Sequence, residues 1–489
     1  MVAANSPFLR WRYLYAPLLI GLTIQGTLLF AQTSSYSSGT TSATQIPTSS
    51  QNTVFGSVAE TKPTPGVLPL TFHDAIERAL RHNLAALLSE YNTTTARGEK
   101  WKQLSELLPN VNANVTEVAQ KQSLEAQGLR GEIVPGVTFP RVIGPFSYFD
   151  TRVSATLKVL DWKAIQQYRA STHSATVALL NLKDARELVV LATGNVYLQA
   201  IAEAARVETA QAQVETADAL YKKAVAQLQA GVIPAIDSLR AQVQFQTRRQ
   251  QLISARNDFA KQKLVVARVV GLAAGQEFDL ADKSPYEPFP IPDLDSSLQR
   301  AYSLRSDYKA AQERLFAAQL ERSAATAGYF PTVGFAADFG EIGATPGSLL
   351  PTFHVAGQLN IPIFQGGRVH SDVLKADASL RQAQAQLGDL RGQIDQDVRT
   401  ALLDLQSSAE QVEVAQSSVN LAEEALTQSR DRFFAGVTDN LEVVQAQEAA
   451  ATAHEELISS LYSHNLAKVS FARAIGRAEE GVLEYLKGK

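Results

Sequence analysis

Residues of alternating polarity occupy four short segments of the chain. The sequence FDTRVSATLKV at 149–159 places apolar or small side chains at every second position, and TFHVAGQLNI at 352–361 does the same. The segment that begins at Val333 shows the same two-residue period, and the segment that begins at Val111 shows it as far as Val115 before the pattern decays. Such a period predicts strands that have one apolar and one polar face. We therefore expect two β-hairpins, at 110–160 and 332–363.

Apolar residues recur with alternating three- and four-residue spacing in the long segment that follows each hairpin. The first such seam comprises Val207, Ala210, Val214, Ala217, Tyr221, Ala224 and Leu228. The second, 205 positions later, comprises Val412, Ala415, Val419, Ala422, Leu426, Ser429 and Phe433. This heptad spacing predicts helices that pack along a narrow, left-handed seam. Because 164–228 contains no proline, we expect one helix of about 65 residues, or about 100 Å.

A short turn sequence occurs twice along the chain. It reads QAGVIPAIDSLRAQ at 229–242 and FAGVTDNLEVVQAQ at 434–447, and ARVVG at 267–271 returns as ARAIG at 472–476. A constant spacing in sequence between such repeated motifs predicts a duplicated architecture. We assign the first repeat to 70–271 and the second to 292–476, with a linker at 272–291 and a tail at 477–489. Each repeat contains a leading helix (71–108 in the first), a β-hairpin, a long helix, a tip turn (229–237 or 434–442) and a return helix.

Strands of about ten residues with this two-residue period are typical of outer-membrane barrels. A water-soluble sheet packed on helices would give the same alternation. Four strands cannot close a pore, and open sheet edges are not tolerated in lipid, so several chains must share one barrel. The predicted fold class is mainly α with a small β part. Duplicated long α-helical hairpins form an α-barrel, and each chain gives four strands to a trimeric 12-stranded transmembrane β-barrel.

Composition and the N-terminus narrow the class of protein. The 489 residues carry a net charge of −4 without a basic run, which argues against nucleic acid as a partner. With no cysteine, the chain has no disulfide, thiolate site or lipidated cysteine. Arg10 and Arg12 precede an apolar run, so we expect a signal peptide at 1–31, with an uncleaved anchor as the alternative. The Ser/Thr/Pro-rich segment 32–69 is predicted to be a solvated linker.

The sequence shows no signature of an enzyme. It contains no P-loop, no Rossmann glycine fingerprint and no His-Glu-x-x-His motif, and its seven histidines lack ligand spacing. We therefore expect no catalytic site, metal or cofactor. The competing interpretation is an exported non-pore coiled-coil scaffold or a periplasmic adaptor protein. An adaptor would carry lipoyl-like and barrel domains, and the sequence shows no such β-rich blocks.

Three features together resemble the TolC-like outer-membrane efflux proteins over residues 70–476. They are NIPIFQGGRVHSDVLKA at 360–376, the LP and FP junctions before the inbound strands, and the two AGV turns. The resemblance implies a homotrimer in the bacterial outer membrane that reaches into the periplasm. It would be an exit duct that receives substrate from an inner-membrane pump or type I secretion transporter through a periplasmic adaptor. The strand–helix junctions would contain Pro109, Pro331, Gly366 and Gly367.

The resemblance also assigns roles to the tip turns, which would gate the duct and contact the adaptor. Its turn residues are Gly231, Val232, Gly436 and Val437, and its candidate gate residues are Asp237, Asp439, Glu442 and Gln445. Gln445 stands where the best-known member has a second acidic residue, and Thr438 replaces a basic residue that helps to lock the tip. Acidic rings of this kind favour cations. For any single acid, the alternative is a solvated turn residue or a helix N-cap.

Overall fold

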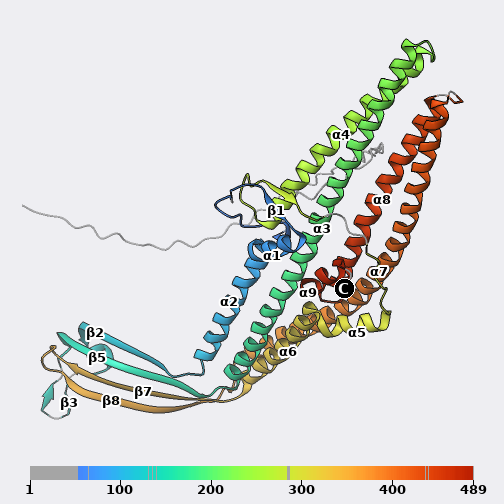
Figure 1. Ribbon diagram of the computed structural model, residues 1–489. Coiled ribbons are helices and arrows are strands. Elements are labelled where there is room, and N and C mark those ends of the chain that lie inside the picture. Colours follow the sequence, from blue (N-terminus) through green and yellow to red (C-terminus); the bar gives the residue numbers. More distant parts are fainter. Residues whose placement is uncertain are drawn as a thin grey trace, which may run out of the picture. The chain divides into compact units, whose positions relative to one another are not determined.

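The computed structural model describes residues 53–63, 65–129, 132–134, 136–138, 140–282, 287–435, 437–438 and 440–487. The chain divides into two units, 1–48 and 49–489, and every described residue belongs to the second. The predicted signal peptide and the first part of the predicted linker therefore lie outside the described residues. Within the second unit, a sheet lies at one end of the long helices and the hairpin turns lie at the other (Figure 1).

The two repeats contain corresponding elements in the same order. The first repeat and its flanking linkers comprise η1 (Thr53–Phe55), β1 (Leu68–Leu70), α1 (Phe72–His82), α2 (Leu84–Ser105), β2 (Asn110–Ser123), η2 (Glu125–Gln127), β3 (Glu132–Val134), β4 (Val137–Thr138), β5 (Val142–Leu160), α3 (Trp162–Gln229), α4 (Ala235–Val270) and β6 (Phe278–Leu280). The second repeat and the C-terminal tail comprise α5 (Leu294–Leu304), α6 (Ser306–Thr326), η3 (Ala327–Tyr329), β7 (Thr332–Gly343), β8 (Leu350–Asn360), α7 (Arg368–Phe434), α8 (Asn440–Ala474) and, in the tail, α9 (Ala478–Lys487). The first repeat is longer in its hairpin because η2, β3 and β4 lie between β2 and β5.

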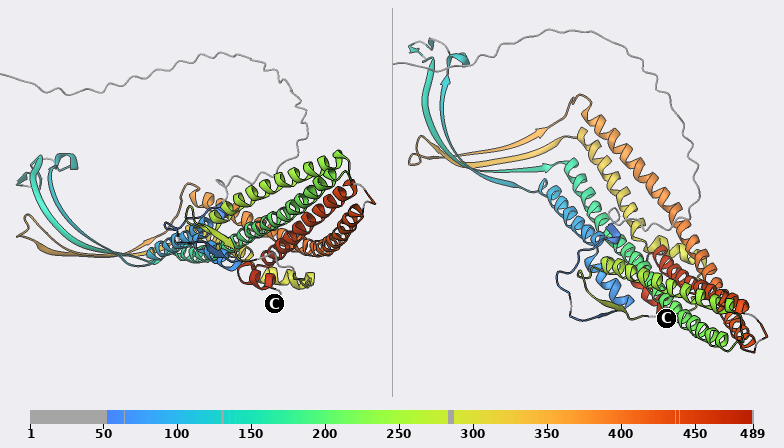
Figure 2. Two further views of the ribbon diagram at one scale, coloured as in Figure 1. Left: turned by 45° about the horizontal axis from the view of Figure 1, so that its top comes forward. Right: turned by 90° about the horizontal axis from the view of Figure 1, so that it is seen from above.

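The strands of the two hairpins form a single antiparallel sheet in the order β2-β5-β7-β8. Figure 2 shows the sheet leaving the helices as a curved layer. In its register Ala113 lies opposite Val153, Val153 opposite Phe339, and Phe339 opposite Phe353, so the apolar positions share one face. A register shift between Lys158 and Leu160 moves Leu160, instead of Val159, opposite Val333. The two repeats are therefore joined through β5 and β7, and β2 and β8 form the edges.

The long helix α3 is the central element of the helical region. It packs against α1, α2, α4, α6, α8 and α9. By length and composition it is the one described helix that could cross a membrane, but 61% of its apolar window is buried inside the fold. The largest core cluster lies around this helix and includes Val190, Tyr197 and Ile201. The apolarity of α3 is therefore accounted for by its packing. On α7, every position of the predicted heptad seam is buried or half-buried.

Each leading helix has a break that the sequence analysis did not predict. The expected continuous helix over 71–108 is two helices, because Asn83 adopts an extended conformation between α1 and α2. Its side chain accepts a hydrogen bond from the Ala85 amide and donates one to the Val54 carbonyl. In the second repeat the leading helix is interrupted at Arg305, which lies between α5 and α6. Helical periodicity continues across such a break, so the pattern alone did not show it.

The predicted linkers are partly ordered against the helices. β1 and β6 form a two-stranded parallel sheet, although they belong to the segments 32–69 and 272–291 at either end of the repeat. The Tyr197 hydroxyl on α3 donates to the Leu70 carbonyl at 2.7 Å. Phe55 and Leu68 pack on the main core cluster. The predicted linker is thus packed on the helices at Phe55 and Leu68, whose apolar partners the helices supply, whereas 61–63 and 65–67 are exposed.

Candidate functional site

Both tip turns are closed by the same hydrogen bond. The Val232 amide donates to the Gln227 carbonyl at 2.9 Å, and the Val437 amide donates to the Arg432 carbonyl at 3.0 Å. These pairs are related by the repeat offset of 205. Gly231 ends α3 with a φ of +72°, a left-handed conformation that glycine adopts without strain. Gly436 and Asp439 lie outside the described residues.

Each tip turn exposes an apolar residue. Val232 and Val437 each expose 69% of their surface. Side chains of this kind at the end of a helical hairpin are available to another protein without any rearrangement of the turn. Gln445, one turn further along α8, is also exposed. The two valines thus give each hairpin an apolar end.

The tip acids Asp237 and Glu442 are both paired with an arginine of their own hairpin. Asp237 is buried in the first turn of α4 and lies 3.4 Å from the Arg240 guanidinium. Glu442 accepts from Arg432 Nη1 at 3.0 Å and from the Thr438 hydroxyl. Sequence reasoning identified Thr438 as the loss of a basic partner, but it missed Arg432. Arg432 lies in the last turn of α7, ten residues before Glu442, so only the fold of the turn brings their charges together.

Polar contacts join the two hairpins behind the tips. Arg248 on α4 is buried, and its guanidinium lies 2.8 Å from Glu448 on α8. Gln244 donates to the same carboxylate at 2.9 Å. Closer to the turns, the Lys223 ammonium lies 3.0 Å from the centre of the Phe434 ring. Ion pairs and hydrogen bonds therefore contribute to holding the two hairpins side by side in this region.

A largely buried charge network joins α3, α6, α7 and α8. Arg473 on α8 pairs with Asp184 and with Glu187 on α3, the latter at 3.0 Å. Arg305 pairs with Asp307 at 2.7 Å and with Asp397 on α7 at 2.9 Å. Four carboxylates therefore share two guanidinium groups.

The network contains more carboxylates than guanidinium groups, and burial changes the pKa of several of these carboxylates. Burial raises the pKa of Glu187 to about 7, although Arg473 opposes the shift. Burial also raises the pKa of Asp184. Asp307 is subject to the same burial, but the hydrogen bond and the charge of Arg305 outweigh it and lower its pKa. Glu187 is thus the member of the network that can change charge near neutral pH.

The strand–helix junctions differ between the repeats. In the first, the Asp161 side chain caps α3 by accepting from the Ala164 amide at 3.0 Å. In the second, Gly366 and Gly367 form a turn with φ of +59° and +84°, and Gly367 is the N-cap of α7. Pro109 and Pro331 lie immediately before β2 and β7. Proline cannot donate to a sheet ladder, so each marks the place where strand pairing begins.

The polar face of the sheet carries a second charge cluster. Arg152 on β5 pairs with Asp150 on its own strand and with Asp338 on β7, and its guanidinium donates to Thr352 on β8 at 3.2 Å. Gly340 lies directly opposite Arg152, where a Cβ would come within 2.9 Å of the Arg152 Cα. The glycine therefore leaves room for the arginine to cross to the neighbouring strands. The polar face thus holds its charges in pairs.

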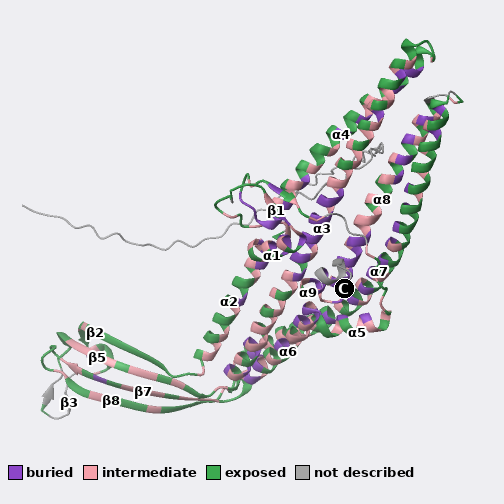
Figure 3. Cartoon of the chain, in the orientation of Figure 1, coloured by how far each residue is buried: buried purple, intermediate pink, exposed green. Residues whose placement is uncertain are grey.

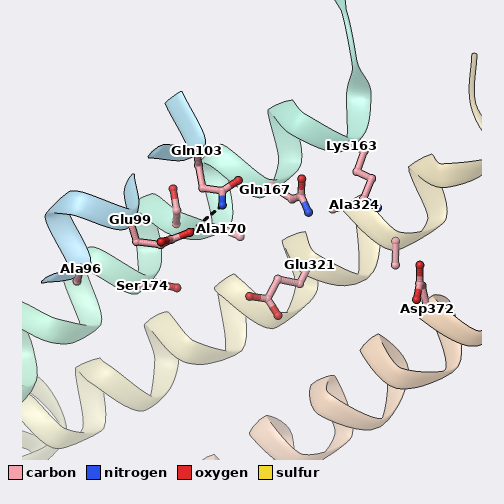
Figure 4. A pocket seen from close by; sticks show the side chains of 12 residues that line it. Ala96, Glu99, Gln103, Lys163, Gln167, Ala170, Ser174, Glu321, Ala324 and Asp372 are labelled. Atoms are coloured by element: carbon pink, nitrogen blue, oxygen red, sulfur yellow. Dashed lines mark hydrogen bonds between the residues drawn. The ribbon is translucent and has the colours of Figure 1, made fainter. Parts of the chain in front are cut away.

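A polar cavity of about 520 Å³ lies where α2, α3, α6 and α7 approach the sheet. Figure 4 shows its lining side chains, among them Glu99, Gln103, Lys163, Gln167, Glu321 and Asp372. Gln103 donates to Glu99 at 2.9 Å, and this hydrogen bond lowers the pKa of Glu99. Among the described residues, no group of three or more metal-binding side chains is found. The cavity lies between helices, and acidic and basic side chains both line it, so its charge does not select one class of ligand.

Comparison with known proteins agrees with this architecture. A family model described as Outer membrane efflux protein matches residues 297–477. Outer membrane protein OprJ of Pseudomonas aeruginosa is 24% identical over 82% of this chain and 83% of its own length. Alkaline protease secretion protein AprF of the same organism is 23% identical over 69% of this chain and 71% of its own.

A solved structure shows the same fold over nearly its whole length. The CmeC outer membrane channel of Campylobacter jejuni superposes with a TM-score of 0.71 at 16% identity, covering 89% of this chain and 94% of that one. Its likeness confirms the fold class, with long helical hairpins and a four-strand sheet in one subunit. Taken together, these comparisons show that the chain is similar to outer membrane efflux proteins, in sequence over residues 297–477 and in fold over most of its length.

Proposed function

We propose that this protein is the outer-membrane exit duct of a tripartite efflux or type I secretion system. It passively conducts substrates from a periplasmic adaptor and an inner-membrane pump or secretion transporter to the outside. The observation that carries the proposal is the sheet, which has one apolar and one polar face and ends in two edge strands. In lipid every backbone group must be paired, so these edges require partners from other chains.

The helical region supports the same conclusion, with a homotrimer as the assembly. α4 packs mainly on α3 and α7 packs mainly on α8, so α4 and α7 lie at opposite sides of the four-helix layer. Figure 3 shows exposed residues along both helices. The large apolar ones among them are Ile236, Leu239, Val243, Ile253 and Leu264 on α4 and Leu403, Val414 and Leu421 on α7. Three chains would bring each α4 against a neighbouring α7 and each β8 against a neighbouring β2, which closes both barrels.

The polar face of the sheet and the hairpin tips indicate the path that a substrate would take through the trimer. The polar face of the sheet, with Arg152 and Asp338, would line a water-filled bore, and the apolar face would contact lipid. The hairpin tips would be the periplasmic entrance, where Val232 and Val437 contact the adaptor and Glu442 and Gln445 contribute to the gate. An N-terminal signal peptide at 1–31 would direct export. No step of this transport requires a cofactor or a catalytic group.

The decisive experiment combines assembly with conduction. We expect the protein extracted from outer membranes in mild detergent to have three times the mass of one chain by light scattering, and to conduct ions in a planar bilayer. A soluble periplasmic monomer without conductance would instead favour a non-pore coiled-coil scaffold or an adaptor. A trimer that binds membranes but conducts no ions would refute the proposed duct function and would still support the proposed trimer.

A further inference from the structure

The polar face of the sheet changes character at its outer end, which is the end farthest from the helices. Near the middle of the sheet this face is charged, because Arg152 pairs there with Asp338. Asp150, two residues from Arg152, lies on the same face, and its partner across the ladder is Ile342 on β7. Ile342 in turn lies opposite Leu350 on β8. Residues directly opposite each other share a face, so the polar face ends in apolar side chains.

The hairpin of β2 and β5 continues this apolar character beyond the end of β7. β5 pairs with β7 only as far as Phe149, but its pairing with β2 continues past that point. On the polar face of this extension Tyr148 lies directly opposite Val118. Tyr148 is also the diagonal neighbour of Ile342, at a separation that an aromatic side chain can span. One row across all four strands therefore comprises Val118, Tyr148, Ile342 and Leu350, and we call it the apolar row.

The opposite face of the sheet is acidic at the level of the apolar row. Glu341 precedes Ile342 and Glu117 precedes Val118, so both acids point to the other face, and both are exposed. A carboxylate within hydrocarbon is unfavourable, so this level of the sheet lies beyond the hydrocarbon of the membrane. The two faces are therefore inverted here, with the acids outside and the apolar side chains toward the proposed bore.

The apolar row is accessible in a single chain. Leu350 exposes 68% of its surface, and the other three side chains are half-buried. Figure 1 shows this end of the sheet far from the described helices, so none of them covers the row. In the proposed trimer each β8 lies beside a neighbouring β2. Leu350 of one chain would then be followed by Val118 of the next, and three rows would close into a ring.

The chemistry of such a ring favours solutes that have an apolar part. A hydrated ion finds no hydrogen-bonding side chain at Val118, Ile342 or Leu350, whereas an apolar group that contacts them is removed from water. Tyr148 adds an aromatic face, which also attracts cations. On the way out, a solute would pass the charges around Arg152 first and the ring afterwards.

We propose that the apolar row forms a solute-binding collar at the outer mouth of the duct, which binds apolar and aromatic groups of exported molecules. The collar is separate from the tip turns, because the sheet and the turns lie at opposite ends of the long helices (Figure 1). The inference rests on the proposed duct function. It adds a second place in the bore at which the chemistry of the solute matters.

Two quaternary ammonium ions that differ by one aromatic ring can test the collar. Benzyltrimethylammonium carries the ring, and tetramethylammonium has the same charge without it. Each ion is added to full-length trimers in planar bilayers, and the current through single channels is measured. We expect benzyltrimethylammonium to reduce the current at concentrations at which tetramethylammonium has no effect.

Serine variants locate the site of this block. Leu350→Ser and Tyr148→Ser should each raise the half-blocking concentration of benzyltrimethylammonium about three- to tenfold, because each removes an apolar contact in every chain. Ala356→Ser is the matched control, since it places a hydroxyl on the same face of β8 closer to the helices, and it should leave the block unchanged. Leu350 is the exposed first residue of β8, so its variant should fold even if Tyr148→Ser does not. Trimer mass is checked for each variant.

The remaining outcomes would overturn the collar or the duct. Equal block by the two ions in the unmodified protein would overturn the inference, as would unchanged block in both variants of the row. A conductance that rises in these variants, without any block of the unmodified protein, would mean that the three rows pack on one another and seal the mouth, which also overturns it. A trimer that conducts no ions in any variant would refute the proposed duct itself.

Discussion

Gly476 lies directly against Arg305, at the place where the return helix of the second repeat meets the break in its leading helix. A Cβ on Gly476 would come within 2.8 Å of the Arg305 Cα, and its φ is +75°. In the first repeat Gly271 has a φ of +77°, and a Cβ there would come within 2.5 Å of the His82 Cβ. Each repeat therefore uses a glycine to end its return helix against the broken leading helix.

Replacement of Gly476 by alanine should destabilise the fold more than the same change at Gly231. Both glycines have a left-handed φ, which costs about 1 to 2 kcal/mol for alanine. Only Gly476 adds a steric clash, because a Cβ on Gly231 would meet nothing within 4 Å. We expect a clearly larger drop in the apparent melting temperature for Gly476→Ala, followed by circular dichroism. Equal drops would mean that the close approach to Arg305 contributes nothing.

We predict that Glu442, a candidate gate residue, controls ion selectivity together with Arg432. Its carboxylate is partly exposed and is held by Arg432 and Thr438, so removing either charge leaves the other uncompensated. Glu442→Ala should move the reversal potential in a salt gradient toward anion permeation, and Arg432→Ala should move it toward cations. Measurements on single channels in planar bilayers provide the comparison. Shifts of the same sign in both variants would contradict the pairing.

Adaptor docking should depend on the apolar ends of the hairpins. Val232→Asp and Val437→Asp introduce charge at exposed positions, so folding and conductance should be unaffected. Export through the assembled system should fall, because a charge in a docking surface must lose its water. Val67→Asp, at an exposed position on the segment before β1, is the matched control. Undiminished export by both tip variants would show that the adaptor contacts another surface.

A charge on the lipid face of the sheet should impair membrane assembly. Leu157 and Phe335 lie opposite each other on the apolar face, whereas the neighbouring Thr156 belongs to the polar face. Leu157→Arg should cost about 2 to 4 kcal/mol near mid-bilayer, and Thr156→Arg should be tolerated because it faces the bore. The yield of trimer from outer membranes measures the difference. A normal yield for Leu157→Arg combined with a loss for Thr156→Arg would reverse the assigned faces.

Stability should fall as pH rises toward neutrality because of Glu187. Its pKa is about 7 in the folded protein against 4.5 for an ordinary glutamate, so between these values the folded state holds a proton that the unfolded state has lost. The stabilisation is complete below about pH 4.5 and disappears as pH rises through 7, a change of about 3 kcal/mol for this group. Asp307, with its lowered pKa, contributes only at lower pH, near its ordinary value of 3.8 and below.

A glutamine at position 187 tests whether Glu187 causes this pH dependence of stability. Glu187→Gln should flatten the change of apparent melting temperature between pH 5 and pH 8 and raise stability at pH 8. Asp395→Asn is the control, because Asp395 is a solvent-exposed acid paired with Arg399 on the surface of α7. A pH dependence that survives in Glu187→Gln would assign the titration to another group, with Asp184 as the next candidate.

Local periodicity was sufficient to predict the main elements. The two-residue period of 149–159 and 352–361 indicated strands, and the heptad seams indicated long helices, because each pattern reports which side of an element is buried. The repeat offset placed the tip turns, and the hydrogen bonds of Val232 and Val437 recur at that offset. A resemblance in the junction and turn motifs was enough to indicate the family, and the fold agrees with it.

Contacts between distant segments were decided only by the tertiary structure. The pairing of β1 with β6 brings together residues about 210 positions apart, and Arg473 reaches Glu187 across 286. The break at Asn83 and the pairing of Arg432 with Glu442 likewise depend on which groups the fold places nearby. A sequence pattern records the average environment of one element, whereas a hydrogen bond or ion pair requires two particular groups to meet. The sequence therefore determined the elements and their faces, and the folded chain determined the partners.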